Sequence, residues 1–113
     1  MNRAVASADD FRRLALAFPG AEERSHMSHP DFRVGGKIFA TLGVPNEAWG
    51  MVALLPEQQE LAVEAEPAAF KLAAGAWGRG GSTLVDLEKV SDAWLERAIR
   101  WAWEKRAPKK LRG

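Results

Sequence analysis

The chain lacks cysteine, and it has no long apolar run. Without thiols it cannot form disulfides, hold a metal or an iron–sulfur cluster through thiolates, or use a cysteine nucleophile. No stretch approaches the roughly 18 apolar residues that span a bilayer, and the N-terminal residues carry no apolar segment typical of a secretion signal. These absences exclude several enzyme classes. They predict a cytoplasmic protein that does not use the membrane as a partner.

Acidic residues outnumber basic residues over positions 1–104, although the net charge of the whole chain is +1. Residues 1–56 carry six Lys/Arg and six Asp/Glu, residues 57–104 carry five and nine, and residues 105–113 carry five and none. A domain that grips nucleic acid over a broad face usually has a pI above about 9. The pI here is about 8.1, so any contact with nucleic acid is predicted to be local.

Length and composition predict one soluble globular domain over residues 1–113, since hydrophobic residues make up 47% and charged residues 27%. We expect residues 1–6 and 108–113 to be flexible.

The clearest structural signal is the pair Gly35-Gly36 between two strand-like runs, 31–34 and 37–42. A two-residue glycine turn predicts a β-hairpin in which Val34 lies opposite Lys37. One face of this hairpin would then carry Phe32, Val34, Lys37, Phe39 and Thr41, and the other Arg33, Ile38, Ala40 and Leu42. We expect helices to cover the first face and leave the second open as a binding surface. If the loop is longer than two residues, only one face is apolar.

The remaining patterns predict a two-layer α+β sandwich, with an antiparallel sheet of about five strands and helices on one face. The expected helices are 7–18, one that starts at Pro56, a short segment over 67–75, and one from Ser91 to about 107. The expected strands are an edge strand near 24–27, the hairpin, 50–55 and 83–87.

The last helix has the strongest pattern. Ser91 is predicted to cap it, and Val90 and Leu95 to form a hydrophobic staple. Its apolar stripe contains Trp94, Leu95, Ala98, Ile99, Trp101 and Ala102. Trp103 is offset from this stripe, so it is expected to be exposed.

The chain contains the segments FPGAEE (18–23), HPDFRVGGKIFATL (29–42), LPEQQ (55–59), GAWGRGGSTLV (75–85) and, after the tryptophan-rich end helix, APKKL (107–111). Together these segments resemble the MmcQ/YjbR family over nearly the whole chain. The resemblance implies a CyaY-like, secretion-chaperone-like α+β fold and a family commonly labelled DNA-binding, with no catalytic residue set to transfer. Many similar sequences place a lysine in the strand before the LPEQQ-like segment, where this chain reads Val52, Ala53, Leu54 and Leu55.

Two residue sets suggest chemistry near the hairpin. His26, His29 and Asp31 offer nitrogen and oxygen ligands for zinc, nickel or iron. An extended backbone does not force both imidazoles to one side, so surface or hydrogen-bonded histidines are the favoured interpretation. Ser28 lies in the same segment but lacks the G-x-S-x-G context of a nucleophile.

The glycine-rich segment 76–82 is expected to be a loop. Its backbone N–H groups and Arg79 offer donors to an anion, but it lacks the signature of a P-loop or of a dinucleotide site. The favoured alternative is a structural turn in which Trp77 packs as a lid on the core.

The leading functional hypothesis is weak, sequence-independent DNA binding, since a basic tail can neutralise phosphates and an exposed indole can stack on a base. Its candidate residues are Arg33, Lys37, Arg79, Trp103, Lys105, Arg106, Lys109, Lys110 and Arg112. The tail can equally be a solvated segment whose cations favour the helix C-terminus. The alternative function is a protein-interaction adaptor or a homodimer that uses the open sheet face. The sequence contains no recognisable pair of catalytic carboxylates, no activated nucleophile and no cofactor fingerprint. We therefore expect neither a bound cofactor nor a catalytic activity.

Overall fold

The turn at Gly35-Gly36 joins β2 (His29–Val34) to β3 (Lys37–Leu42). In the computed structural model, which describes residues 6–112, these glycines have φ angles of 60° and 80°. L residues rarely adopt such angles, so a side chain at either position would strain the backbone. Val34 pairs with Lys37 across the turn, and the predicted two-residue hairpin is confirmed.

The strands form one antiparallel sheet of six strands in the order β1-β2-β3-β4-β6-β5. In addition to the two hairpin strands, the sheet contains β1 (Glu22–His26), β4 (Trp49–Ala53), β5 (Phe70–Leu72) and β6 (Ser82–Asp86). β1 is the predicted edge strand, and it is exposed along its whole length. Its charged and polar side chains disfavour pairing with the edge of another molecule.

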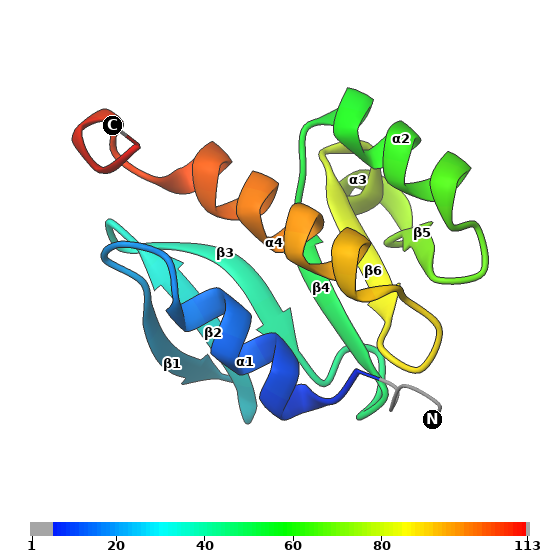
Figure 1. Ribbon diagram of the computed structural model, residues 1–113, viewed down its shortest axis with the longest axis horizontal. Coiled ribbons are helices and arrows are strands. Elements are labelled where there is room, and N and C mark those ends of the chain that lie inside the picture. The colour runs from blue at the N-terminus through cyan, green and yellow to red at the C-terminus, as the bar shows by residue number, and fades with distance from the viewer. Residues whose placement is uncertain (1–5, 113) are drawn as a thin grey trace.

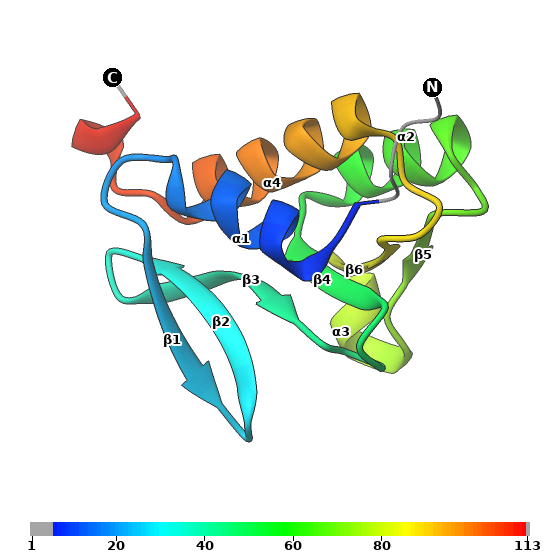
Figure 2. The same ribbon diagram turned by 60° about the horizontal axis from the view of Figure 1, so that its bottom comes forward.

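Helices cover one face of this sheet. α1 (Ala8–Leu16), α2 (Pro56–Ala65) and α4 (Asp92–Arg106) lie on the same side of it in Figure 2. The short helix α3 (Gly75–Arg79) lies on the other side. α4 runs across β3 and β4 and packs beside α1 (Figure 1). This arrangement is the predicted two-layer α+β architecture.

The core lies between the sheet and the helices. The buried residues of α4 are Leu95, Ala98, Ile99, Ala102 and Trp103. They pack in one cluster with fully buried residues of the sheet such as Phe32 and Phe39. Full burial of a large apolar side chain contributes about 1.5–3 kcal/mol, so this cluster is the main source of stability. Among residues 6–112, no helix is both long and apolar enough to cross a membrane.

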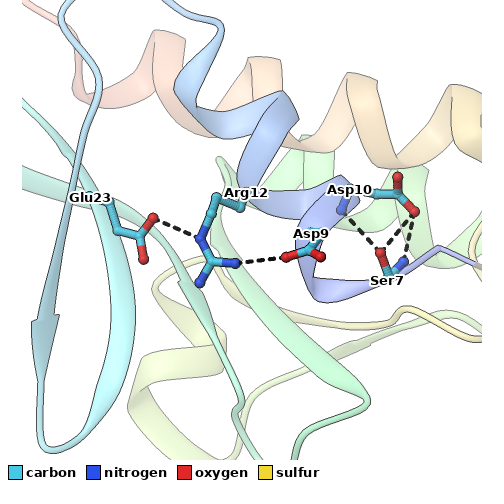
Figure 3. A network of polar contacts seen from close by, with 5 residues as sticks. All are labelled: Ser7, Asp9, Asp10, Arg12 and Glu23. Atoms are coloured by element: carbon cyan, nitrogen blue, oxygen red, sulfur yellow. Dashed lines mark hydrogen bonds and ion pairs between the residues drawn. The ribbon is translucent and has the colours of Figure 1, made fainter.

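α1 begins with a capping box (Figure 3). The backbone N–H of Asp10 donates to Ser7 Oγ, while the backbone N–H of Ser7 donates to Asp10 Oδ2 at 2.9 Å. That bond to the carboxylate lowers the pKa of Asp10. Arg12 then ties the helix to β1, because its Nε donates to Glu23 Oε1 at 2.8 Å. The helix ends at Leu16, two residues earlier than predicted.

Two segments differ from the prediction. The predicted helix over 67–75 is absent except at Gly75, where α3 begins. The segment contains β5 instead, in which Phe70 pairs with Val85 and is 1% exposed. The alanines there favour a helix locally, but burial of Phe70 beside β6 outweighs that propensity. Segment 76–82 is not all loop, since α3 occupies its first half.

The predicted faces of β3 are also partly wrong. Phe32 pairs with Ala40, whereas Arg33 pairs with Ile38, so Phe39 is an extra residue in β3. Such a bulge shifts the alternation of side chains. Ala40 and Leu42 therefore face the helices, and Thr41 faces the open side. Arg33 and Ile38 lie on the open side, as predicted.

Both ends of the described chain contact the core. Ala6 is 4% exposed, although the sequence predicts a flexible start; residues 1–5 lie outside the described part. At the other end, Lys109–Leu111 forms a 3-10 helix. Leu111 packs against the core, and a Cβ built on Gly20 would lie 2.9 Å from its Cδ1.

Candidate functional site

The C-terminal segment packs against the tip of the hairpin. A Cβ built on Gly35 would lie 3.0 Å from Cγ of Pro108. This contact places Pro108, which directly precedes the 3-10 turn Lys109–Leu111, beside the β2–β3 turn. The segment and the turn together present four exposed cations, which we call the C-terminal cation cluster: Lys37, Lys109, Lys110 and Arg112.

Lys105 and Arg106 belong to the packed end of α4 and not to this exposed cluster. Nζ of Lys105 donates to the carbonyl oxygen of Leu54 at 2.8 Å. Burial lowers the pKa of Lys105, and the neighbouring Arg106 lowers it further. Arg106 is half-buried and lines a cavity in the sheet. Neither side chain is free to lie along a nucleic-acid backbone without moving.

Trp103 is buried, so its predicted exposure is wrong. It is 6% exposed, its ring stacks on Phe18 with centroids 5.4 Å apart, and its Nε1–H donates to the carbonyl oxygen of Pro19 at 2.9 Å. The predicted stripe is too narrow, because the end of α1 and the residues after it cover a second flank of α4. No base can stack on this indole in the folded protein.

Arg33 is held by a carboxylate on the same strand. Asp31 and Arg33 are two residues apart in β2, so both point to the open side. Arg33 Nε donates to Asp31 Oδ1 at 2.8 Å, and His26 Nδ1 lies 2.7 Å from Asp31 Oδ2. Asp31 is 0% exposed. The bonds from Arg33 lower the pKa of Asp31, with a smaller contribution from His26 and against the effect of burial. Asp31 in turn raises the pKa of Arg33.

The structure brings together His26 and Asp31 of the predicted metal set, but as a hydrogen-bonded pair. Asp31 accepts bonds from His26 and Arg33, while His29 pairs with His26 across the β1–β2 turn and lies near Gly43. Within residues 6–112, no group of three or more His, Asp or Glu side chains is arranged to hold a metal ion. The lone pairs of Asp31 already have donors, so this carboxylate is a poor ligand.

Arg79 and Trp77 lie on α3, on the open side of the sheet. Arg79 is exposed at the end of α3, and the backbone N–H groups of Gly80 and Gly81 already donate to carbonyl oxygens of that helix. Trp77 is 77% exposed, so its predicted role as a lid on the core is wrong. The glycines of this segment serve packing: a Cβ on Gly78 would collide with the carbonyl oxygen of Ala73.

The open side of the sheet contains a cavity of about 250 Å³, which we call the open-face hollow. Its wall includes His26 from the end of β1 and Trp77 from α3. Its lining residues are His26, Ile38, Thr41, Met51, Trp77 and Ser82. The hollow is therefore largely apolar, with the imidazole of His26 and two hydroxyl groups in its wall.

Sequence reasoning missed the buried ion pair and the hollow. The spacing of Asp31 and Arg33 could have predicted the pair, because residues two apart in a strand point to the same face of the sheet. The hollow had no such sign: its wall comes from separate strands and α3, and the bulge at Phe39 reverses the expected position of Thr41.

Comparisons with known proteins bear on the fold. A family model described as YjbR matches residues 16–105. A search of curated proteins finds no match. Among solved structures, the crystal structure of Deinococcus radiodurans protein DR2400, with a domain of the DUF419 family model, is similar with a TM-score of 0.76. The identity is 18%, and the alignment covers 99% of this chain and 89% of that chain. At this identity the likeness concerns the fold alone.

Proposed function

This chain belongs to the YjbR family, and within that family we propose that it binds the phosphate backbone of DNA weakly and without sequence preference. The observation that carries the proposal is the C-terminal cation cluster. Its members come from the hairpin and from the C-terminal turn, and within residues 6–112 none of them forms an ion pair with a carboxylate.

The proposal is narrower than the sequence suggests. Arg33 is engaged by Asp31, Lys105 and Arg106 are packed, and Trp103 is buried. A contact of this size neutralises few phosphates and carries no base readout. Affinity will therefore be low, and its logarithm will fall with the logarithm of the salt concentration by only about 0.9 for each phosphate neutralised. We propose a binding role and not a catalytic one, because His26 uses Nδ1 on Asp31 and no nucleophile is hydrogen-bonded to it among the described residues.

The test is fluorescence anisotropy with a labelled 20-base-pair duplex and the matching single strand at two or more salt concentrations. We expect the double substitution Lys109→Ala/Lys110→Ala to weaken binding uniformly across sequences. It should also reduce the salt slope by about 0.9 for each phosphate that the variant no longer neutralises.

The matched control is Lys89→Ala/Arg97→Ala, which removes equal charge from exposed positions outside the cluster. Absence of binding by the wild-type protein at low salt would refute the proposal. Equal weakening in the control and the test variant would show that only net charge matters.

A second candidate is a protein-interaction adaptor or homodimer that uses the open sheet face. The observation in its favour is Trp77, which is 77% exposed beside the apolar wall of the hollow. Light scattering on wild type and Trp77→Gln distinguishes the homodimer: a wild-type monomer at high concentration excludes self-association, whereas a dimer that dissociates in the variant supports it.

A further inference from the structure

Strands β3 and β4 separate at one end of the sheet. Their pairing runs from Leu42 opposite Gly50 to Ala40 opposite Val52, and it does not continue to Ile38. A cavity of about 170 Å³ lies at this end, which we call the β3–β4 notch. Its wall includes Ile38, Thr41, Ala53 and Ser82, and Arg106 reaches it from the end of α4.

Two buried polar atoms without partners belong to residues that line this notch. Within residues 6–112, the buried side-chain nitrogen and oxygen atoms that lack a hydrogen bond are Thr41 Oγ1 and Arg106 Nε. Both residues line the notch. Thr41 is 1% exposed. Folded proteins rarely leave such atoms unsatisfied, so two of them in residues around one cavity favour the binding of a polar group there.

The chemistry of Thr41 Oγ1 and Arg106 Nε favours an anionic oxygen as their hydrogen-bond partner. Arg106 Nε carries a hydrogen and a permanent positive charge, and the Thr41 hydroxyl can donate. The wall of the notch contains no acidic residue. The nearest carboxylate by register, Asp31 opposite Thr41, already accepts bonds from His26 and Arg33. Arg106 therefore has no counter-ion among the described residues.

The notch adjoins the open-face hollow. The two cavities share Ile38, Thr41, Met51 and Ser82 in their walls. The hollow adds the exposed ring of Trp77 to the apolar surface that the shared residues Ile38 and Met51 provide. A ligand that fills both would thus have a charged group at the notch and an apolar body in the hollow, the usual division of a small-molecule site.

We propose that this paired cavity binds a small monocarboxylate with an apolar chain or ring. One guanidinium and one hydroxyl match the two oxygens of a carboxylate, whereas a phosphate dianion calls for more donors. The apolar body lies against Ile38, Met51 and Trp77. This site is independent of the C-terminal cation cluster, because it uses Arg106 and none of the cluster residues.

The test is a titration of ¹⁵N-labelled full chain with octanoate, followed by NMR. We expect saturable shifts at Thr41, Ser82 and the Nε–H of Arg106, and no comparable response to octanol or to acetate. Arg106→Gln should weaken octanoate binding about tenfold or more, since a charge-assisted hydrogen bond is removed. Arg112→Gln is the matched control and should bind octanoate as the wild type does.

Thr41→Val gives a second, separate readout. It replaces an unsatisfied hydroxyl by a methyl group of similar size, so without ligand we expect an unchanged or raised melting temperature, together with weaker octanoate binding. Absence of saturable binding, equal binding of octanol, or wild-type affinity in Arg106→Gln would overturn the proposal. If Arg106→Gln fails to fold, an unmoved Arg106 Nε–H signal in the wild type overturns it equally.

Discussion

At the scale of single residues, Asp31 is the most constrained polar group of the open face. It is fully buried, and its carboxylate is satisfied by Arg33 and His26. Removing one partner of a buried pair leaves the other uncompensated. Arg33 is 28% exposed, and water therefore compensates part of its charge. The pair positions His26 at the hollow as well as stabilising the hairpin.

We expect Asp31→Asn to lower the free energy of unfolding at neutral pH by about 1–3 kcal/mol. The pKa of Asp31 is lower in the folded state than its ordinary value of 3.8. Its ionic stabilisation is therefore fully present above that value and is lost as pH falls through the folded-state pKa. Urea unfolding between pH 6 and about pH 2 should show a smaller acid-dependent loss in Asp31→Asn than in the wild type.

Asp9→Asn is the control, since the Asp9 side chain is 93% exposed. Parallel acid-dependent losses in wild type and Asp31→Asn would contradict the assignment of this stabilisation to Asp31.

At the scale of elements, Trp103 of α4 and Trp77 of α3 have opposite environments. Trp103 of α4 is buried, stacked on Phe18 and hydrogen-bonded to Pro19. Trp77 of α3 contacts mainly solvent. We expect Trp103→Ala to destabilise the fold by about 3–5 kcal/mol and Trp77→Ala by about 0.5 kcal/mol or less. Denaturant unfolding of both variants checks this, and similar losses of stability would contradict the placement of one of the two rings.

The elements that the sequence predicts are those with local signals. The Gly35-Gly36 turn, the Ser91 cap and Pro56 at the start of α2 are confirmed. β5 and α3 were missed because their formation depends on distant partners. Phe70 gains burial only beside β6, and Gln59 of α2 donates to the carbonyl oxygen of Gly78 in α3 at 3.0 Å.

The candidate site was less predictable for the same reason. Lys37 is exposed next to a turn, and its exposure follows from local pattern. The burial of Trp103 follows from the position of α1, which no local spacing encodes. The bulge at Phe39 moves Thr41 to the open side, and this single shift creates the unsatisfied hydroxyl of the notch.

At the scale of the whole molecule, the C-terminal turn is part of the packed structure. Pro108 lies over Gly35, and Leu111 contacts the core. A truncation that removes this segment would remove both charge and packing. Substitution of single cations is consequently the cleaner way to test nucleic-acid binding.

We expect Leu111→Ala to lower the free energy of unfolding by about 1–2 kcal/mol, less than for a fully buried leucine because Leu111 is half-buried. Lys110→Ala, its exposed neighbour, should stay within about 0.5 kcal/mol of wild type. Thermal or urea unfolding gives both values. Equal stability of Leu111→Ala and wild type would show that the turn is not docked in solution.

The position of α4 has a consequence for how the protein is made. This helix covers β3 and β4 and follows all six strands in the sequence. During synthesis the strands therefore leave the ribosome before the helix that shields their apolar face. Until α4 emerges, it cannot bury the apolar face of β3 and β4, and the paired strands lack this stabilisation. We therefore expect the domain to complete its folding only after translation has passed Arg106.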